Sequence, residues 1–134
     1  MEPDRCIRER NEIVKMFGEC QNIIFAISNG YRQKIILALL TSDHVGQRVE
    51  EITSHTDLSR PAVSHHLKVL KDAGIVSMER RGTKNLYYLS ADVGMWTRMS
   101  ELMCKIRDVS KAASESGYPF LSEGGRDDKR PGSD

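Results

Sequence analysis

The chain has 134 residues, of which 39% are hydrophobic and 29% charged. This length suits one modest domain and leaves too little chain for two ordinary hydrophobic cores. The formal net charge of +1 excludes a uniformly basic nucleic-acid coat, so a phosphate-binding surface has to come from local clusters of Lys and Arg. We predict one folded domain at residues 7–113, between a flexible N-terminus at residues 1–6 and a disordered tail at residues 114–134.

The cellular compartment is predicted from segments that the sequence lacks. It contains no run of about 18 apolar residues for a membrane span, and its first residues lack the apolar core of a secretory signal. The three cysteines are widely spaced and odd in number, which argues against a disulfide scaffold and a CxxC zinc site. We expect a cytoplasmic protein with reduced thiols and no membrane contact.

Residues 7–27 are predicted to form one amphipathic helix. Its apolar side chains fall on one side of a helical projection: Ile13, Phe17, Cys20, Ile24 and Ile27. Apolar residues also recur every seven positions, at Cys6, Ile13, Cys20 and Ile27, which is the spacing of a seam between helices. We therefore expect this helix to pack along another helix.

A second helix is predicted to begin at Ser28-Asn29-Gly30 and to run through Leu40. Its expected core residues are Ile35, Ile36, Leu39 and Leu40. The polar segment Thr41–Gln47 is predicted to be a loop, and residues 48–55 a short third helix.

The fourth helix is predicted to start after Ser59, a good N-cap, and to end before Gly74. Two short β-prone runs follow at residues 75–80 and 85–89. The glycine in Arg81-Gly82-Thr83-Lys84 allows the positive φ of a tight hairpin, and no other strand is predicted.

A last helix is expected at residues 91–113, capped by Ser90. Its apolar residues share one face: Trp96, Met99, Leu102, Met103, Ile106 and Val109. The fold class is therefore mainly α with one small β-hairpin, in the order α-α-α-α-β-β-α.

The fourth helix and the hairpin carry the candidate functional residues. Val63, Leu67 and Leu70 share the inner face of the helix, with His66 at its edge. Polar or small residues on the outer face match the needs of a helix in the DNA major groove, and the hairpin tip offers cations for the DNA backbone or minor groove. The predicted DNA contacts are Arg60, Ala62, Ser64, His65, Lys68, Arg80, Arg81 and Lys84.

Charge separates along the chain in support of this hypothesis. The segment from Ser59 to Tyr88 has six cations and two anions, whereas the segment from Asp43 to Leu58 has one cation and four anions. The alternative interpretation of the outer face is a solvated helix surface. The short preceding helix, the turn and the basic hairpin together favour a winged helix-turn-helix.

The stretch LSRPAVSHHLKVLKDAGIVSMERRGTKNLYYL resembles the recognition helix and wing of the arsenical-resistance repressor (ArsR/SmtB) family. The resemblance covers about residues 20–108. In AISNGYRQKIILALL, Arg32 occupies the family's usual arginine position, although Asn29-Gly30 replaces the common Asp-Pro before it.

This resemblance implies a homodimer in which the first and last helices pair across a two-fold axis and two recognition helices read a palindromic operator. The function implied is that of a sequence-specific transcriptional regulator, a repressor released by an effector or by thiol modification. The predicted dimer interface is Ile13, Phe17, Cys20, Ile24, Trp96, Met99, Met103 and Ile106.

The family's familiar metal ligands have no counterpart here. The resemblance aligns its cysteine pair with Arg48 and Glu50, and no histidine follows His66 for the site of the last helix. No metal or cofactor is therefore predicted. Cys20 and Cys104 remain as a candidate thiol sensor for an oxidant, a polysulfide or arsenite, with Cys20 as a small apolar interface residue the alternative.

Two other classes of function are an enzyme and a protein-binding module. An enzyme is not predicted, because no cysteine has a histidine within one helical turn and no phosphate-binding loop is present. A winged-helix module that binds an acidic protein partner, without a specific DNA target, is the alternative to the regulator.

Overall fold

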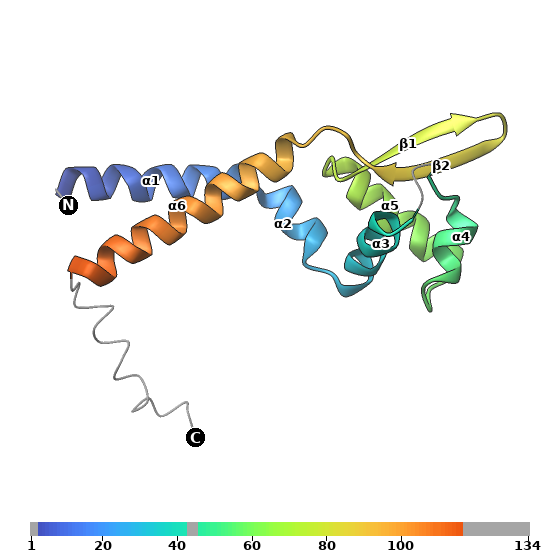
Figure 1. Ribbon diagram of the computed structural model, residues 1–134, viewed down its shortest axis with the longest axis horizontal. Coiled ribbons are helices and arrows are strands. Elements are labelled where there is room, and N and C mark those ends of the chain that lie inside the picture. Colours follow the sequence, from blue (N-terminus) through green and yellow to red (C-terminus); the bar gives the residue numbers. More distant parts are fainter. Residues whose placement is uncertain (1–2, 43–45, 117–134) are drawn as a thin grey trace, which may run out of the picture. The chain divides into compact units, whose positions relative to one another are not determined.

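A computed structural model describes residues 3–42 and 46–116, which fold into two compact units. Of these described residues, 3–18 and 100–116 belong to one unit, and those within Glu19–Met99 belong to the other. The elements in chain order are α1 (Pro3–Glu19), α2 (Gln21–Ile27), α3 (Gly30–Leu40), α4 (Val49–Ser54), α5 (Arg60–Asp72), β1 (Val76–Arg81), β2 (Lys84–Leu89) and α6 (Gly94–Ser116) (Figure 1). The predicted fold class, mainly helical with one hairpin, is confirmed.

The single helix predicted over residues 7–27 is wrong, because the chain breaks into α1 and α2 at Cys20. This residue has φ −99° and ψ 6°, outside the helical region, and it is fully buried. Gly18, a weak helix former, lies in the last turn of α1 and lowers the cost of ending the helix there. The order of elements is therefore α-α-α-α-α-β-β-α in the described chain, and the break coincides with the boundary between the two units.

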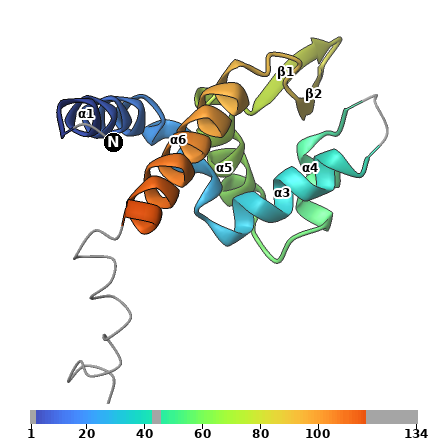
Figure 2. The same ribbon diagram turned by 60° about the vertical axis from the view of Figure 1, so that its left-hand side comes forward.

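The core of the Glu19–Met99 unit surrounds α5, which contacts α2, α3, α4 and β1 (Figure 2). Its side chains are apolar and come from every element of this unit except β2: Ile23, Ala26, Ile35, Leu39, Ile52, Val63, Leu67, Leu70, Ile75, Val76 and Met95. Leu40, expected in the core, is instead 63% exposed, since it occupies the solvent side of the last turn of α3. The predicted inner face of the fourth helix is confirmed by the burial of Val63, Leu67 and Leu70.

Strands β1 and β2 form an antiparallel hairpin whose register pairs Val76 with Leu89 and Arg81 with Lys84. The turn is therefore the two residues Gly82-Thr83, and Gly82 has φ 63°, as in a type II′ turn. The hairpin also has a neighbour that the sequence pattern did not reveal: Gln47 and Tyr87 exchange backbone hydrogen bonds of 2.8 and 2.7 Å. Gly46 precedes this bridge with φ 82°, and a Cβ there would lie 3.2 Å from the carbonyl oxygen of Tyr87.

The start and end of α6 also differ from expectation. The helix begins at Gly94 rather than Ala91, because the Asp92 carboxylate, and not Ser90, accepts the N–H of Gly94 at 2.9 Å. The hydroxyl of Ser90 accepts the N–H of Asp92 instead, at 3.2 Å. The helix continues to Ser116, and the remainder of the predicted tail lies outside the described residues.

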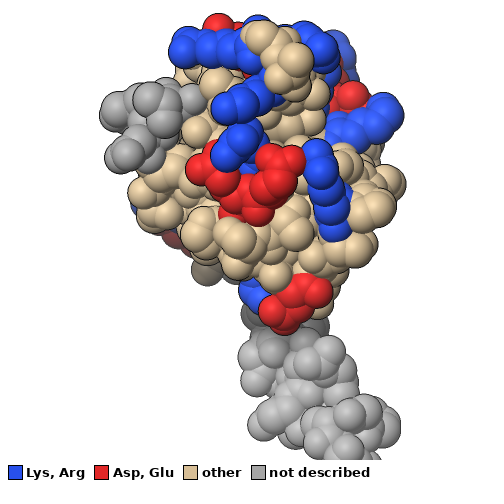
Figure 3. All heavy atoms as spheres, turned by 90° about the vertical axis from the view of Figure 1, so that its right-hand side faces the viewer, with Lys and Arg blue, Asp and Glu red and all other residues tan. Residues whose placement is uncertain are grey.

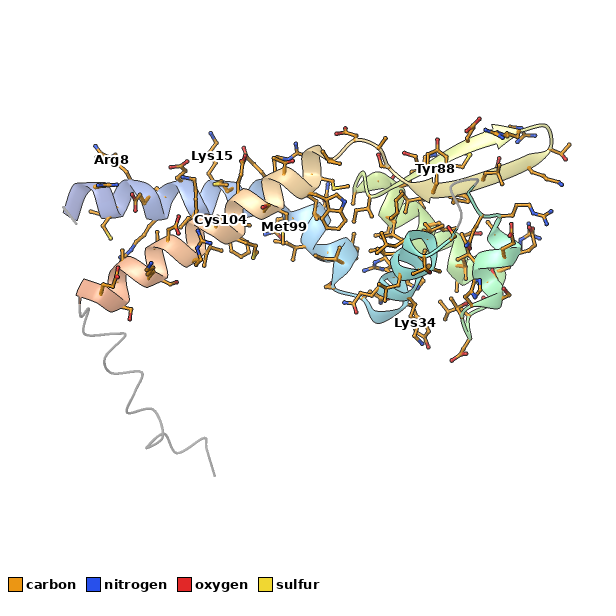
Figure 4. All side chains as sticks on the ribbon, in the orientation of Figure 1. Arg8, Lys15, Lys34, Tyr88, Met99 and Cys104 are labelled. Carbon is orange, nitrogen blue, oxygen red and sulfur yellow. The ribbon has the colours of Figure 1, made fainter. Side chains whose placement is uncertain are left out.

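The other unit contains α1 and the larger part of α6. Lys105 Nζ and Glu12 Oε1 form an ion pair of 3.2 Å between these two helices. Cys6, Leu102 and Ala113 are buried, whereas Arg8 and Lys15 are exposed and, in Figure 4, point away from α6.

No single helix among the described residues has the length and apolar composition to cross a membrane. Helices α2 and α3, bent by 87° at their junction, reach that length and composition only as a pair.

Candidate DNA-binding surface

Helix α5 presents a polar face because its apolar face is fixed in the core. Ser59 starts the helix, with its hydroxyl accepting the N–H of Ala62 at 3.3 Å, and Pro61 occupies the first turn. With three apolar residues of α5 buried, Ser64, His65 and Lys68 are left exposed, together with Arg60 at the helix start. Ala62 is half-buried. The structure therefore brings the predicted residues of this helix onto one solvent-facing surface.

Helix α4 and the turn that follows it precede α5 in the chain, and α4 packs against α5. The backbone N–H of Arg48 donates to Glu51 Oε1 at 3.0 Å, and this hydrogen bond lowers the pKa of the Glu51 carboxyl. In the turn between α4 and α5, the N–H of Leu58 donates to the Thr56 hydroxyl at 3.2 Å. Helices α4 and α5, joined by this tight turn, form a helix-turn-helix. The side chain of Ile52 is buried, so α4 packs against the core.

The hairpin places its cations at the tip. Arg81 and Lys84 face each other across the two-residue turn, and Arg80 is the next residue along β1. All three side chains are exposed. The bridge between Gln47 and Tyr87 fixes β2 to the segment before α4, which holds the base of the hairpin while its tip projects beyond the helices (Figures 1 and 2).

Acidic side chains accompany several of the candidate cations, a feature that sequence reasoning missed. Ion pairs join Arg60 Nη2 to Glu50 Oε1 at 2.7 Å, Lys68 Nζ to Asp72 Oδ2 at 3.0 Å, and Arg81 Nε to Glu79 Oε1 at 3.0 Å. Spacing along α5 predicts the second of these pairs, but the first joins two helices and depends on tertiary structure. All of them are exposed, so each contributes little to stability and phosphates can compete for the cations.

The face that carries the hairpin tip and α4 combines both signs of charge. Figure 3 shows Lys and Arg along the hairpin edge and an acidic cluster below it. Within the described residues, Arg80 and Lys84 form no ion pair. A hollow of about 240 Å³ lies between α4, the start of α5 and the hairpin turn, lined by Arg48, Val49, Glu50, Arg60, Thr83, Lys84 and Asn85.

His66 does not belong to the polar face. Arg32, which is only 4% exposed, donates from Nη1 to His66 Nδ1 at 3.1 Å, and also to the carbonyl oxygens of Ala26 and Phe25 at 2.8 and 2.9 Å. Because a guanidinium only donates, the neutral His66 ring carries its proton on Nε2. Burial, and then the charges of Arg32 and His65, lower the pKa of His66. This arginine therefore ties the end of α2 to α5, a role that the sequence did not reveal.

The two candidate sensor thiols have different exposure. Cys20 is fully buried at the break between α1 and α2, whereas Cys104 is exposed on α6 (Figure 4). Arg48 and Glu50, which the resemblance noted in the sequence aligns with a cysteine pair, both line the hollow beside α5. Over residues 3–42 and 46–116, no group of three or more His, Cys, Asp or Glu side chains could hold a metal ion.

The predicted dimer-interface residues include several exposed apolar side chains. Phe17 is 39% exposed, Trp96 37% and Met103 46%. Ile13, Ile24, Met99 and Ile106 are half-buried, and Cys20 is buried.

Comparison with known proteins gives this geometry its context. Residues 31–78 match the family model described as bacterial regulatory protein, arsR family. The transcriptional repressor SdpR of Bacillus subtilis is 36% identical over 72 residues, which are 54% of this chain and 77% of that protein. The repressor SmtB of Mycobacterium tuberculosis is 37% identical over 79 residues, covering 59% of this chain and 54% of that protein.

A solved structure extends the likeness to the fold. The ArsR-like transcriptional regulator from Rhodococcus sp. RHA1 superposes with a TM-score of 0.65 at 18% identity, covering 83% of this chain and 96% of that one. At this identity the superposition bears on the fold alone, which is a winged helix-turn-helix in both. The chain belongs to the ArsR family of DNA-binding transcriptional regulators.

Proposed function

We propose that the chain is a homodimeric repressor that reads a palindromic DNA operator with α5 and holds the DNA backbone with the β1–β2 hairpin. The observation that carries this proposal is the exposed polar face of α5 beside a hairpin tip with three exposed cations. In a cell, such a protein acts in the cytoplasm on double-stranded DNA. Its functional domain is residues 7–113.

The residues of α5 divide between the bases and the phosphates. Ser64 and His65 offer hydrogen-bonding groups from the exposed face, and Ala62 is small enough to approach a thymine methyl group. Arg60 lies at the helix start, where a guanidinium can bind the O6 and N7 atoms of guanine. Lys68 lies about two turns further along the helix and is assigned to a phosphate.

The hairpin supplies contacts that do not depend on sequence. Arg80, Arg81 and Lys84 project beyond the helices, where they can reach the backbone or an adjacent minor groove. Cations of this kind release counterions from DNA, so binding should weaken steeply as salt is added.

The dimer is supported by apolar side chains that one chain leaves exposed. Phe17, Trp96 and Met103 are more than a third exposed, which is costly for large apolar groups unless a second copy covers them. A two-fold dimer presents two copies of α5, which fit half-sites about one helical turn apart.

Release of DNA is proposed to follow an effector or a thiol modification. Cys104 is the accessible thiol, while Cys20 is reached only after local opening. Replacing either cysteine by serine should leave DNA affinity unchanged and abolish any response to oxidant, polysulfide or arsenite. If both variants respond as the wild type does, the cysteines are not the sensor.

The test of DNA reading is a selection from randomised duplexes, followed by a salt-dependent gel shift with a palindromic fragment of the protein's own promoter. The wild type should enrich one palindrome, and Arg60→Ala and His65→Ala should weaken binding to it. The competing function is a winged helix that binds an acidic protein through the basic hairpin. That function predicts that no duplex is enriched and that both substitutions leave DNA binding unchanged.

A further inference from the structure

The ion pair between Arg60 and Glu50 links the start of the proposed recognition helix to α4. Arg60 Nη2 and Glu50 Oε1 are 2.7 Å apart, and the two side chains are 65% and 50% exposed. The other ion pair on α5, between Lys68 and Asp72, lies within that helix. Arg60 is therefore the α5 cation whose position depends on a second element of the fold.

Stability does not account for this pair, since exposed ion pairs have little effect on the free energy of unfolding. Its effect is on the conformation of Arg60, because an unrestrained arginine samples many rotamers and loses that freedom on binding. A carboxylate on one nitrogen restricts the guanidinium before DNA arrives. The second hydrogen of Nη2 and those of the other two nitrogens remain, so a fork of two adjacent N–H donors is still available to a ligand.

The surroundings of the pair make the carboxylate unexpected. Among the described residues that line the hollow between α4, α5 and the hairpin, Glu50 is the sole acidic one, beside Arg48, Arg60 and Lys84. Coulomb's law makes a negative charge at this place unfavourable for contact with phosphates. A surface selected for general DNA affinity alone has no use for Glu50.

We propose that Glu50 is a positioning residue that sets sequence specificity: it holds Arg60 for bidentate contact with one guanine in the major groove and keeps it from a neighbouring phosphate. This inference rests on the proposed function, because it assigns the groove to α5. Glu50 thereby lowers affinity for arbitrary DNA and raises selectivity at one base pair.

Three substitutions at position 50 separate geometry from charge. Glu50→Gln and Glu50→Ala remove the negative charge and the ion pair, while Glu50→Asp keeps the charge but withdraws the carboxylate from Arg60. Asp57→Asn is the matched control, since it removes a negative charge from the turn before α5 and Asp57 takes part in none of the ion pairs described above. Circular dichroism and thermal melting verify that each variant is folded.

The probe is the duplex that the wild type enriches from a randomised library. The position to vary is the one at which Arg60→Ala loses the preference for guanine, and each of the four base pairs is placed there in turn. Discrimination at that position should fall about tenfold in Glu50→Gln, Glu50→Ala and Glu50→Asp. Affinity for a scrambled duplex should rise in the first two and stay unchanged in Glu50→Asp. Asp57→Asn should keep full discrimination. In an Arg60→Ala background, Glu50→Gln should have no further effect on discrimination.

A purely electrostatic role for Glu50 predicts different results. Glu50→Gln would then raise affinity for selected and scrambled duplexes by the same factor, and Glu50→Asp would discriminate among the four base pairs as the wild type does. Either result overturns the inference and leaves the proposed function intact, as does an Arg60→Ala variant that discriminates like the wild type. If the wild type enriches no duplex, the proposed function itself fails and the inference fails with it.

Discussion

Arg32 illustrates how one side chain fixes the relation between two helices. Its guanidinium satisfies two carbonyl groups at the end of α2 and the imidazole of His66 on α5, all from a nearly buried position. Arg32→Met keeps the length but removes every donor, so the free energy of unfolding should fall by about 2–3 kcal/mol. Urea unfolding at fixed protein concentration measures this loss. The control is Gln33→Met, which removes one exposed hydrogen bond to Ile27 and should cost less than about 0.5 kcal/mol.

His66 makes stability depend on pH. Its pKa is lowered in the folded protein, chiefly by burial, so the unfolded chain binds more protons as pH falls through the ordinary pKa of 6.5. The free energy of unfolding should therefore be lower at pH 5.5 than at pH 7.5. Glu51, whose pKa is also lowered, contributes only at more acidic pH, below its ordinary value of 4.5. Urea unfolding of His66→Gln should show a smaller difference between the two pH values, and an equal difference would exclude this role.

At the scale of elements, the hairpin should contribute affinity without sequence preference. Arg80→Ala and Lys84→Ala should each weaken binding to selected and scrambled duplexes by similar factors. Each should also reduce the slope of log affinity against log salt by about 1. Fluorescence anisotropy over a salt series measures both effects. Lys34→Ala is the control, because Lys34 lies on α3, away from the hairpin (Figure 4), and should leave the slope unchanged. A slope unaffected by the hairpin variants would contradict the assignment.

Elements with strong local signals could be predicted from the sequence, and those set by tertiary contacts could not. Ser59, Pro61 and Gly74 mark the limits of α5, and Gly82 marks the hairpin turn, because caps and positive φ act locally. The break at Cys20 has no comparable signal, since its residues fit a continuous helix. The bridge from Gln47 to Tyr87 joins segments far apart in the chain, and the Arg60–Glu50 pair joins two different helices, so the periodicity of a single element predicts neither contact.

At the scale of the whole molecule, the exposed apolar side chains of α1 and α6 should hold the dimer together. Phe17→Glu and Met103→Glu should shift the protein to monomer at micromolar concentration, because a buried charge without a partner opposes association. Sedimentation velocity measures the change. Lys15→Glu is the control, since Lys15 is an exposed polar residue of α1 that points away from α6 (Figure 4) and lies outside the predicted interface, and this variant should remain dimeric. A wild type that is monomeric at tens of micromolar would contradict the proposed assembly.

The central claim is that the exposed face of α5 reads DNA sequence. The most direct measurement is the ratio of affinities for the enriched palindrome and a scrambled duplex of equal composition, at one physiological salt concentration, for the wild type and for Ser64→Ala/His65→Ala. The wild-type ratio should be on the order of 10³ or more. In the double variant this ratio should fall by at least about tenfold, whereas the affinity for the scrambled duplex should equal that of the wild type. An unchanged ratio in the double variant would show that sequence is read elsewhere on the protein.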